Sequence, residues 1–169
     1  MKIIKSVPNQ NLYFFEEKVE VGSAPSSTET GVVNVFDEIE YQSVLGFGGA
    51  FTESSAYNYS LLTAEQKKDF LEKYFSKDKG IGYNFGRMHI NSCDFSLDIY
   101  SYVERGDVEL KTFNIERDRK YIIPLIKDAM QYSDEEIILF ASPWSPPAFM
   151  KENDNEVRGG KLKEEYKNA

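Results

Sequence analysis

The sequence has 169 residues, of which 41% are hydrophobic and 28% are charged, and it contains 12 Phe and 11 Tyr. This composition is typical of a globular protein and excludes a disordered tail, a collagen-like chain and a coiled coil. The 20 basic and 28 acidic residues give a net charge of −8, which makes nucleic acid and anionic lipid poor electrostatic partners.

The cysteine count and the length of the apolar runs restrict which cofactors the protein could bind and where in the cell it could lie. Cys93 is the only cysteine and His89 the only histidine, so the sequence offers neither an internal disulfide nor a zinc cluster, and we expect no metal and no cofactor. The N-terminus lacks the apolar stretch of a secretory signal, and no apolar run approaches the ~20 residues that cross a bilayer. We therefore expect a cytoplasmic protein without a membrane span, while removal of a leader would still allow export.

The first quarter of the chain has the pattern of strands. Residues 11–21 are rich in aromatic and β-branched side chains and predict a strand, and the Gly, Pro and Ser content of 22–31 predicts a loop. Short strands are expected at 32–36 and 41–45, the second leading into Gly46-Phe-Gly-Gly-Ala50. These glycines match neither a P-loop nor a dinucleotide fingerprint, and instead indicate a strand end approached by a ligand or a neighbouring segment.

After residue 45 helices and strands alternate. The expected elements are a helix from Thr52 to Ser60, a helix opened by a Thr63–Gln66 capping box, strand 83–90, helix 118–132, strand 136–141 and a helix beginning within 161–169. The second helix carries an apolar stripe at Phe70, Leu71, Tyr74 and Phe75. The helix at 118–132 buries Ile122, Leu125, Ile126 and Ala129, with Pro124 at a kink or in its first turn. This alternation predicts an α/β fold with parallel strands.

Two strands end in residues suited to a binding site. Asp94 follows strand 83–90, and Trp144 follows strand 136–141 in a proline-stiffened segment. Ligands of parallel α/β sheets bind beyond the carboxyl ends of the strands. A carboxylate that accepts two hydrogen bonds and a flat indole suit a sugar ring. The alternative is structural: Asp94 caps the next turn and Trp144 packs in a core.

Three further residues of strand 83–90 and its end admit both structural and functional interpretations. Arg87, a charge in an apolar strand, forms either a structural ion pair or a clamp on an active-site carboxylate. We interpret Cys93 as a small buried hydrophobe. His89 has no nucleophile elbow nearby, which leaves a catalytic triad unsupported, and we interpret it as a strand residue with satisfied hydrogen bonds.

Four linked motifs carry a family resemblance. They are Gly46-Phe-Gly-Gly-Ala-Phe-Thr-Glu53, Gly80-Ile-Gly-Tyr-Asn-Phe-Gly-Arg87, Ser92-Cys-Asp-Phe-Ser96 and Ala141-Ser-Pro-Trp-Ser-Pro-Pro147. In this order and spacing they resemble the N-terminal part of a glycoside hydrolase family 30 enzyme of the glucosylceramidase type. The resemblance covers residues 44–150, and residues 1–43 agree only in general character.

The resemblance implies a (β/α)₈ TIM barrel with an attached β-sandwich. Residues 1–43 would supply strands of the sandwich, and residues 44–169 the first three or so β/α units, since a whole barrel needs ~250 residues. The resemblance also implies retaining hydrolysis of β-glycosides by two glutamates, one in an Asn-Glu-Pro motif after barrel strand 4 and one at strand 7. It assigns sugar binding to Asp94 and Trp144, and a supporting role at the base of the site to Arg87.

Both catalytic glutamates would lie beyond Ala169, so we expect no catalytic residue in this chain. Asn155-Glu156 lacks the following proline and a preceding strand, and the family assigns no catalysis to Glu53. The expected function is therefore that of a truncated glucosylceramidase-like β-glycosidase that is inactive by itself. Its substrate would be a β-glucoside or a glucosylceramide-like molecule, and its partner would be the rest of the barrel. The alternatives are a non-catalytic sugar-binding module and a related enzyme of the family, a β-1,6-glucanase or a β-xylosidase.

An open three-stranded sheet also predicts physical behaviour. The strand at 136–141 would expose Ile137, Ile138, Leu139 and Phe140 where barrel strand 4 should pair. We expect the isolated chain to be aggregated or molten.

Overall fold

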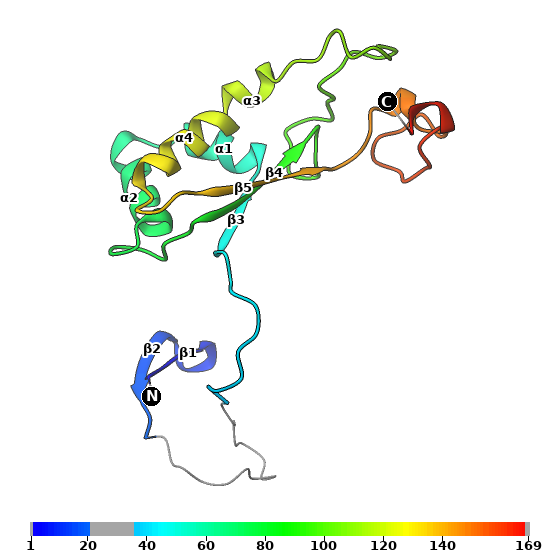
Figure 1. Cartoon of the computed structure of the whole chain (residues 1–169). Coiled ribbons are helices and arrows are strands. Elements are labelled where there is room, and N and C mark those ends of the chain that lie inside the picture. Colours follow the sequence, from blue (N-terminus) through cyan, green and yellow to red (C-terminus); the bar gives the residue numbers. More distant parts are fainter. Residues whose placement is uncertain (1, 21–35, 168–169) are drawn as a thin grey trace. The chain divides into compact units, whose positions relative to one another are not determined.

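The computed structural model describes residues 2–20 and 36–167, and the chain divides into two units, residues 1–43 and 44–169 (Figure 1). The loop expected at 22–31 lies outside the described residues, as does nearly all of the strand expected at 32–36.

The first unit contains an antiparallel hairpin of β1 (Lys2–Val7) and β2 (Leu12–Lys18), joined through the 3₁₀ turn η1 (Pro8–Gln10). The strand expected at 11–21 is confirmed with shorter bounds, and β1 was not expected. Lysines interrupt the apolar pattern of β1, and one of them, Lys2, pairs with Glu16 of β2 at 2.7 Å. Phe14 is 82% exposed, so the hairpin does not bury its aromatic side chains within this unit.

The second unit begins its sheet at β3 (Gly48–Phe51), and the strand expected at 41–45 is wrong. The reason lies in the glycines: a Cβ on Gly48 would come within 1.3 Å of the Phe85 carbonyl oxygen. Only glycine allows the chain to approach β4 (Phe85–Ile90) this closely, so pairing starts there. The segment that approaches the glycines is therefore the neighbouring strand.

Both expected N-terminal caps are confirmed. The Thr52 hydroxyl accepts a hydrogen bond from Ser55 N at 3.2 Å, and helix α1 (Glu53–Ser60) follows. Thr63 and Gln66 form the complete capping box of helix α2 (Ala64–Phe75). In the apolar stripe of α2, Leu71 and Phe75 are buried, while Tyr74 is exposed.

The helix expected at 118–132 is two helices, α3 (Glu116–Lys120) and α4 (Ile122–Tyr132). Pro124 lies in the first turn of α4, and a continuous helix would press its ring against the carbonyl of Lys120, four residues earlier. The chain therefore breaks at Tyr121. The expected buried face of α4 is confirmed and comprises Ile122, Leu125, Ile126 and Ala129.

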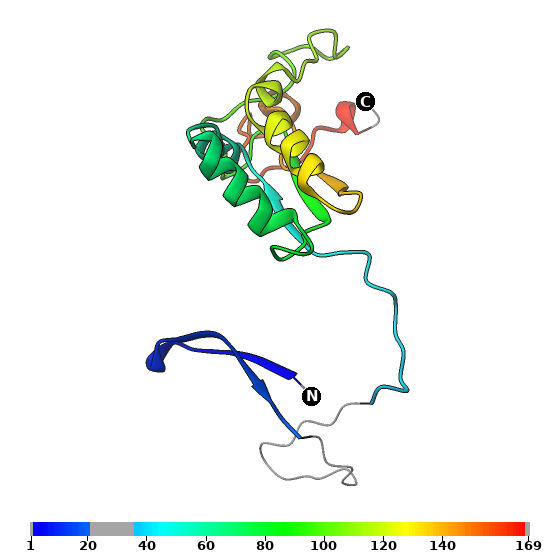
Figure 2. The same ribbon diagram turned by 90° about the vertical axis from the view of Figure 1, so that its left-hand side faces the viewer.

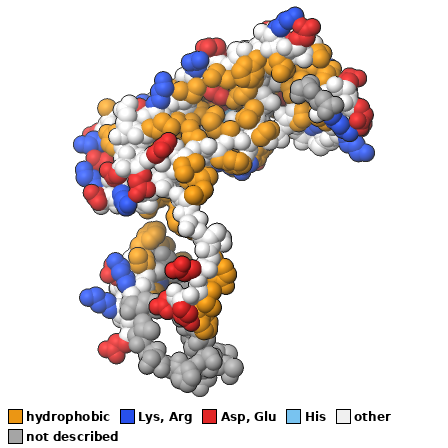
Figure 3. Space-filling view, viewed as in Figure 1, with side chains coloured by type: hydrophobic (Ala, Val, Ile, Leu, Met, Phe, Trp, Pro, Cys, Tyr) orange, Lys and Arg blue, Asp and Glu red, His pale blue; other side chains and the backbone are white. Residues whose placement is uncertain are grey.

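The sheet of the second unit has the order β3-β4-β5, with all strands parallel, and β5 spans Ile138–Pro143. Helices α1, α2 and α4 lie on one side of it (Figures 1 and 2) and bury a common core with Phe51 of β3. Ile138, Leu139 and Phe140 are exposed as expected, and many hydrophobic side chains of this unit reach the surface (Figure 3). Ile137 is buried, contrary to expectation, because it precedes β5 and packs in the helix-side core.

After β5 the chain forms two 3₁₀ turns, η2 (Ala148–Met150) and η3 (Glu164–Tyr166), connected by a bridge between Lys151 and Leu162. The α-helix expected from residue 161 is wrong within the described residues, because only the turn η3 forms there. Among the described residues, no helix has the length and apolarity needed to cross a membrane.

Candidate functional site

A hollow of about 770 Å³ lies beyond the carboxyl ends of β4 and β5. It is lined by the segment after β4, by the segment after β5 and by the loop that follows η2. Its acidic and basic lining residues are Asp94, Asp98, Lys151 and Glu156. Trp144 lines the same hollow, so the structure brings together the two residues that the sequence proposes for sugar binding.

Asp94 and Trp144 are both available to a ligand. Asp94 is exposed, and none of the described residues provides a hydrogen-bond partner for its carboxylate. In the adjacent turn the Ser96 hydroxyl, rather than Asp94, accepts the hydrogen bond from Cys93 N. Trp144 is 44% exposed and does not belong to the buried core. The structural alternative, a capping aspartate and a core tryptophan, is therefore wrong.

Arg87 supports the indole. Its guanidinium lies 4.7 Å from the centre of a Trp144 ring, and its Nε donates a hydrogen bond to Ser142 Oγ at 3.1 Å. A cation over an indole is stabilised by the ring quadrupole. No carboxylate of the described residues pairs with Arg87, so the structural ion pair is not found here. A role as a clamp on an active-site carboxylate stays a prediction.

An ion pair with a buried carboxylate holds the segment that contains Asp94. Glu53, at the start of α1, is 1% exposed, and its Oε1 lies 2.7 Å from Arg117 Nε. Its Oε2 accepts a hydrogen bond from Leu97 N at 2.8 Å, which attaches the loop to α1. The hydrogen bond to Glu53 raises the pKa of Arg117. Sequence reasoning missed Arg117 because nothing near it in the sequence reveals a partner 64 residues away.

Two tyrosines fix the far part of the same loop. The hydroxyls of Tyr100 and Tyr102 donate hydrogen bonds to the carboxylate of Asp118, which is buried in α3. Burial raises the pKa of both phenols, and the neighbouring Asp118 raises it further. Both tyrosines therefore stay protonated donors at neutral pH. Sequence reasoning had also missed this carboxylate.

The interpretations of His89 and Cys93 need correction. His89 is buried, and its Nδ1 lies 2.6 Å from the Asn91 carbonyl, but its Nε2 has no partner among the described residues. Its side chain is therefore only half satisfied, with one ring nitrogen paired and the other unpaired. Cys93 is partly rather than fully buried, and its Sγ accepts a hydrogen bond from Phe95 N at 3.3 Å.

The loop at 151–160 contributes Glu156 and a buried lysine. Glu156 Oε1 accepts a hydrogen bond from Ala148 N at 3.3 Å, and the residue does not follow a strand. Lys151 is 4% exposed, and its ammonium donates to Ser145 Oγ and to the Glu156 carbonyl. Within the described part of the chain, no group of three or more His, Cys, Asp or Glu residues is placed to hold a metal ion.

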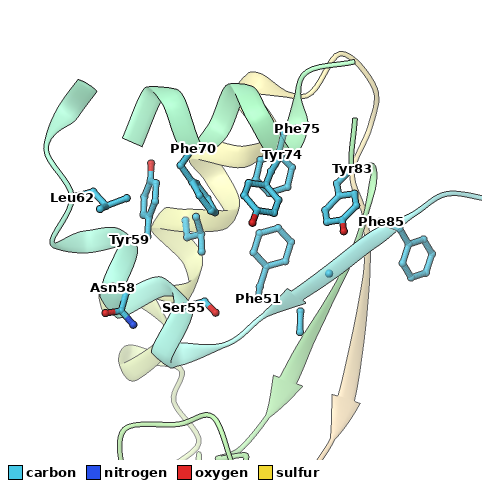
Figure 4. Close-up of a pocket in the computed structure, with 13 residues that line it drawn as sticks. Phe51, Ser55, Asn58, Tyr59, Leu62, Phe70, Tyr74, Phe75, Tyr83 and Phe85 are labelled. Carbon is cyan, nitrogen blue, oxygen red and sulfur yellow. The ribbon is translucent and has the colours of Figure 1, made fainter. Parts of the chain in front are cut away.

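A second hollow, of about 460 Å³, lies between α1, α2 and β3 (Figure 4). Aromatic side chains dominate its lining, among them Phe51, Tyr59, Phe70 and Tyr74. The Tyr59 hydroxyl donates a hydrogen bond to Asp128 at 2.7 Å and so faces a partner rather than a ligand. This hollow lacks a free acid or base among its lining residues, so it is a poor catalytic site.

Comparison with known proteins identifies the fold and the family. Residues 44–169 match the model of the glycosyl hydrolase family 30 TIM-barrel domain. The chain therefore belongs to glycosyl hydrolase family 30, and its parallel sheet β3-β4-β5 is part of a TIM barrel. Only β3 and β4 are followed by α-helices in the described residues, so two β/α units and a third strand are present rather than three units. That family assignment agrees with the resemblance read from the four motifs.

Two relatives show how much of a family member is present. The chain is 41% identical to putative glucosylceramidase 4 of Caenorhabditis elegans and 39% identical to lysosomal acid glucosylceramidase of Mus musculus. These matches cover 85% and 86% of this chain but only 28% and 29% of the two relatives.

Two solved structures are also similar. The crystal structure of SrfJ from Salmonella typhimurium matches with a TM-score of 0.79 and 36% identity, over 97% of this chain and 36% of that one. The endo-β1,6-glucanase BT3312 matches with a TM-score of 0.67 and 29% identity, over 78% of this chain and 30% of that one.

Proposed function

We propose that this chain supplies the sugar-binding part of a retaining, glucosylceramidase-like β-glycosidase. The observation that carries the proposal is the convergence of Asp94 and Trp144 on one hollow at the carboxyl ends of β4 and β5. In TIM barrels this end of the strands carries the active site. The higher identity to the two glucosylceramidases than to the β1,6-glucanase favours a β-glucoside of the glucosylceramide type over a β-1,6-glucan.

Each residue has a defined task in this proposal. The free carboxylate of Asp94 accepts hydrogen bonds from two neighbouring hydroxyls of the sugar in the −1 position. The exposed indole of Trp144 contacts an apolar face of the same sugar. Arg87 holds the indole in place from the strand side through its stacking and its bond to Ser142.

The chemical step needs groups from outside this chain. Retaining hydrolysis uses two carboxyl groups about 5–5.5 Å apart, one as nucleophile and one as acid/base. The family resemblance places both after later strands of the barrel. We therefore propose that the 169-residue chain is inactive by itself and that the remainder of the barrel is its partner.

The hairpin of the first unit has a role in the same proposal. Two-stranded hairpins are marginally stable in water. The exposed Ile4, Tyr13 and Phe14 of β1 and β2 are suited to packing against a second sheet. We propose that residues 1–43 contribute strands to a side β-sandwich whose other strands lie outside this chain.

A two-part assay tests the proposal. The chain is produced together with a segment that carries barrel strands 4–8 of a relative, and hydrolysis of a chromogenic β-glucoside is measured. The proposal predicts activity well above that of either part alone. An absence of gain, with complex formation verified by size-exclusion chromatography, would count against it. Sugar binding without hydrolysis would support the non-catalytic alternative.

A β-1,6-glucanase is the second candidate, and the similarity to BT3312 favours it. The same two-part protein is therefore assayed with a β-1,6-linked gluco-oligosaccharide. Preference for this substrate over the aryl glucoside would select the glucanase, whereas the reverse preference would select the glucosylceramidase type.

A further inference from the structure

Asn91 is the first residue after β4 and directly precedes the loop that carries Asp94 to the hollow at the strand ends. Its backbone is in the left-handed region, with φ at 62°. This conformation is costly for residues other than glycine, although Asn tolerates it better than most. Left-handed non-glycine residues persist where surrounding interactions hold them, often at functional sites.

The side-chain amide of Asn91 bonds both to the loop that contains Asp94 and to the segment that contains Trp144. Its Oδ1 accepts a hydrogen bond from Tyr102 N at 2.9 Å, at the end of the loop that contains Asp94. Its Nδ2 donates to the carbonyl of Ser145 at 3.1 Å, directly after Trp144. Both partners are backbone atoms of fixed polarity, so the amide can satisfy them in one orientation only.

The segment that contains Trp144 is held in place by this hydrogen bond and by few others. Trp144 N donates to the Ile90 carbonyl at 3.2 Å, which fixes the residue on the side of β4. On the other side, Ser145 bonds through its hydroxyl to the Glu156 carbonyl at 2.7 Å. The Asn91 amide is thus the direct link between the segment of Trp144 and the loop of Asp94.

We propose that Asn91 is a positioning residue that sets the separation of Asp94 and Trp144 and thereby the affinity for the sugar. This inference rests on the function proposed above. Glycine at this position would relieve the backbone cost but would lose both bonds. The turn could form with glycine, so the two side-chain hydrogen bonds of Asn91 have a role other than forming the turn.

Two variants separate positioning from stability. Asn91→Gly removes both bonds and relaxes the backbone, whereas Asn91→Asp keeps the acceptor for Tyr102 N but places an oxygen against the Ser145 carbonyl. Asn11→Gly is the matched control, because Asn11 is also left-handed, with φ at 54°, and lies in the hairpin outside the hollow.

Two readouts are taken on the complex of this chain with the separately produced segment that carries strands 4–8. Trp144 is the only tryptophan of the chain, so 5-fluorotryptophan incorporated into it gives a single ¹⁹F signal from the hollow. The second readout is KM and kcat for the aryl β-glucoside in the two-part enzyme.

Both Asn91 variants should shift or broaden the Trp144 signal and raise KM about three- to tenfold, the equivalent of one or two hydrogen bonds. The thermal stability of Asn91→Gly should stay close to that of the wild type, and Asn11→Gly should change neither the signal nor KM. An unchanged Trp144 signal in both Asn91 variants would overturn the proposal. A shifted signal in a protein that neither binds nor hydrolyses glucosides would retain the positioning role and refute the function.

Discussion

The two hollows of the second unit differ in what surrounds them. The hollow between α1, α2 and β3 is lined mainly by aromatic and aliphatic side chains from regular elements. The hollow at the strand ends is lined by irregular segments that carry three carboxylates, an ammonium and an exposed indole. Because side chains between packed elements must be apolar, chemistry-bearing residues collect where the strands end.

Because of this difference, mutations in the two hollows should affect different properties of the protein. The aromatic hollow borders β3, whose second edge has no partner strand among the described residues. It resembles a core that lacks a neighbouring layer. The strand-end hollow is held by the Glu53–Arg117 pair and the Asn91 amide, which order a loop without filling the space. Mutations in the first should therefore change stability, and mutations in the second should change sugar binding.

The largest expected effect concerns the open sheet itself. The 169-residue chain expressed alone should be aggregated or molten, because β5 exposes Ile138, Leu139 and Phe140 and β3 has a free edge in the described structure. Burial of one such side chain contributes about 1.5–3 kcal/mol, which is large beside a total stability of about 5–15 kcal/mol. Size-exclusion chromatography with light scattering and a thermal melt measure this. A cooperative transition from a monodisperse 19.4 kDa monomer would contradict the expectation.

Asp94→Asn should lower kcat/KM of the two-part enzyme about 10²- to 10³-fold, since hydrogen bonds to a charged acceptor contribute about 1.5–3 kcal/mol each. Its melting temperature should stay within the error of the wild type. Asp98→Asn is the control, because Asp98 lines the same hollow but lies 3.2 Å from Arg117. Equal losses in the two variants would mean that Asp94 has no specific role.

Leu125→Ala should act on stability alone. Leu125 is buried on α4 and borders the aromatic hollow, so its truncation should cost about 2–3 kcal/mol, the lower part of the usual range, because one side of the residue is already unpacked. Urea unfolding of the two-part protein measures the loss. Met130→Ala on the same helix is the control: its side chain is 44% exposed, and the expected cost is below about 0.5 kcal/mol. Loss of activity per folded molecule in Leu125→Ala would show that the two hollows do not act independently.

Tyr59→Phe should give the smallest effect and a pH signature. Burial, aided by the hydrogen bond to Asp128, raises the pKa of Tyr59 in the folded state above its unfolded value near 10. The folded state therefore favours the neutral phenol, and this contribution is complete below pH ~10 and is lost as the pH rises further. Unfolding at pH 8 and pH 10.5 should show a smaller decline in stability for Tyr59→Phe than for the wild type. Tyr41→Phe, at an exposed position, should leave the decline unchanged; an equal decline in all three proteins would refute the account.

The helices could be predicted from sequence because their signals are local. Thr52 and the Thr63–Gln66 box mark two helix starts within three residues each. Strand bounds depend on partners instead: the apolar residues at 41–45 predicted a strand, but pairing begins where Gly48 meets Phe85. The break at Tyr121 could also be predicted from sequence, because in a continuous helix the ring of Pro124 would clash with the carbonyl of Lys120.

The candidate site divides in the same way. Asp94 and Trp144 could be proposed because each directly follows a strand and has a side chain suited to sugars. Their supports could not, since the Glu53–Arg117 pair spans 64 residues and Asn91 reaches Ser145 across 54. The burial of Lys151 could not be predicted either, because its ammonium is satisfied by the Ser145 hydroxyl and the Glu156 carbonyl only in the folded chain.

Sugar binding at the strand-end hollow is the central claim, and calorimetric titration tests it most directly. A non-hydrolysable thio-β-glucoside is titrated into the two-part protein, with Trp144→Ala as the site variant and Tyr74→Ala, at the aromatic hollow, as its control. The account predicts saturable binding in the wild type and in Tyr74→Ala, and an affinity reduced about tenfold or more in Trp144→Ala. Equal affinity in all three proteins, or no binding by a folded wild type, would contradict it.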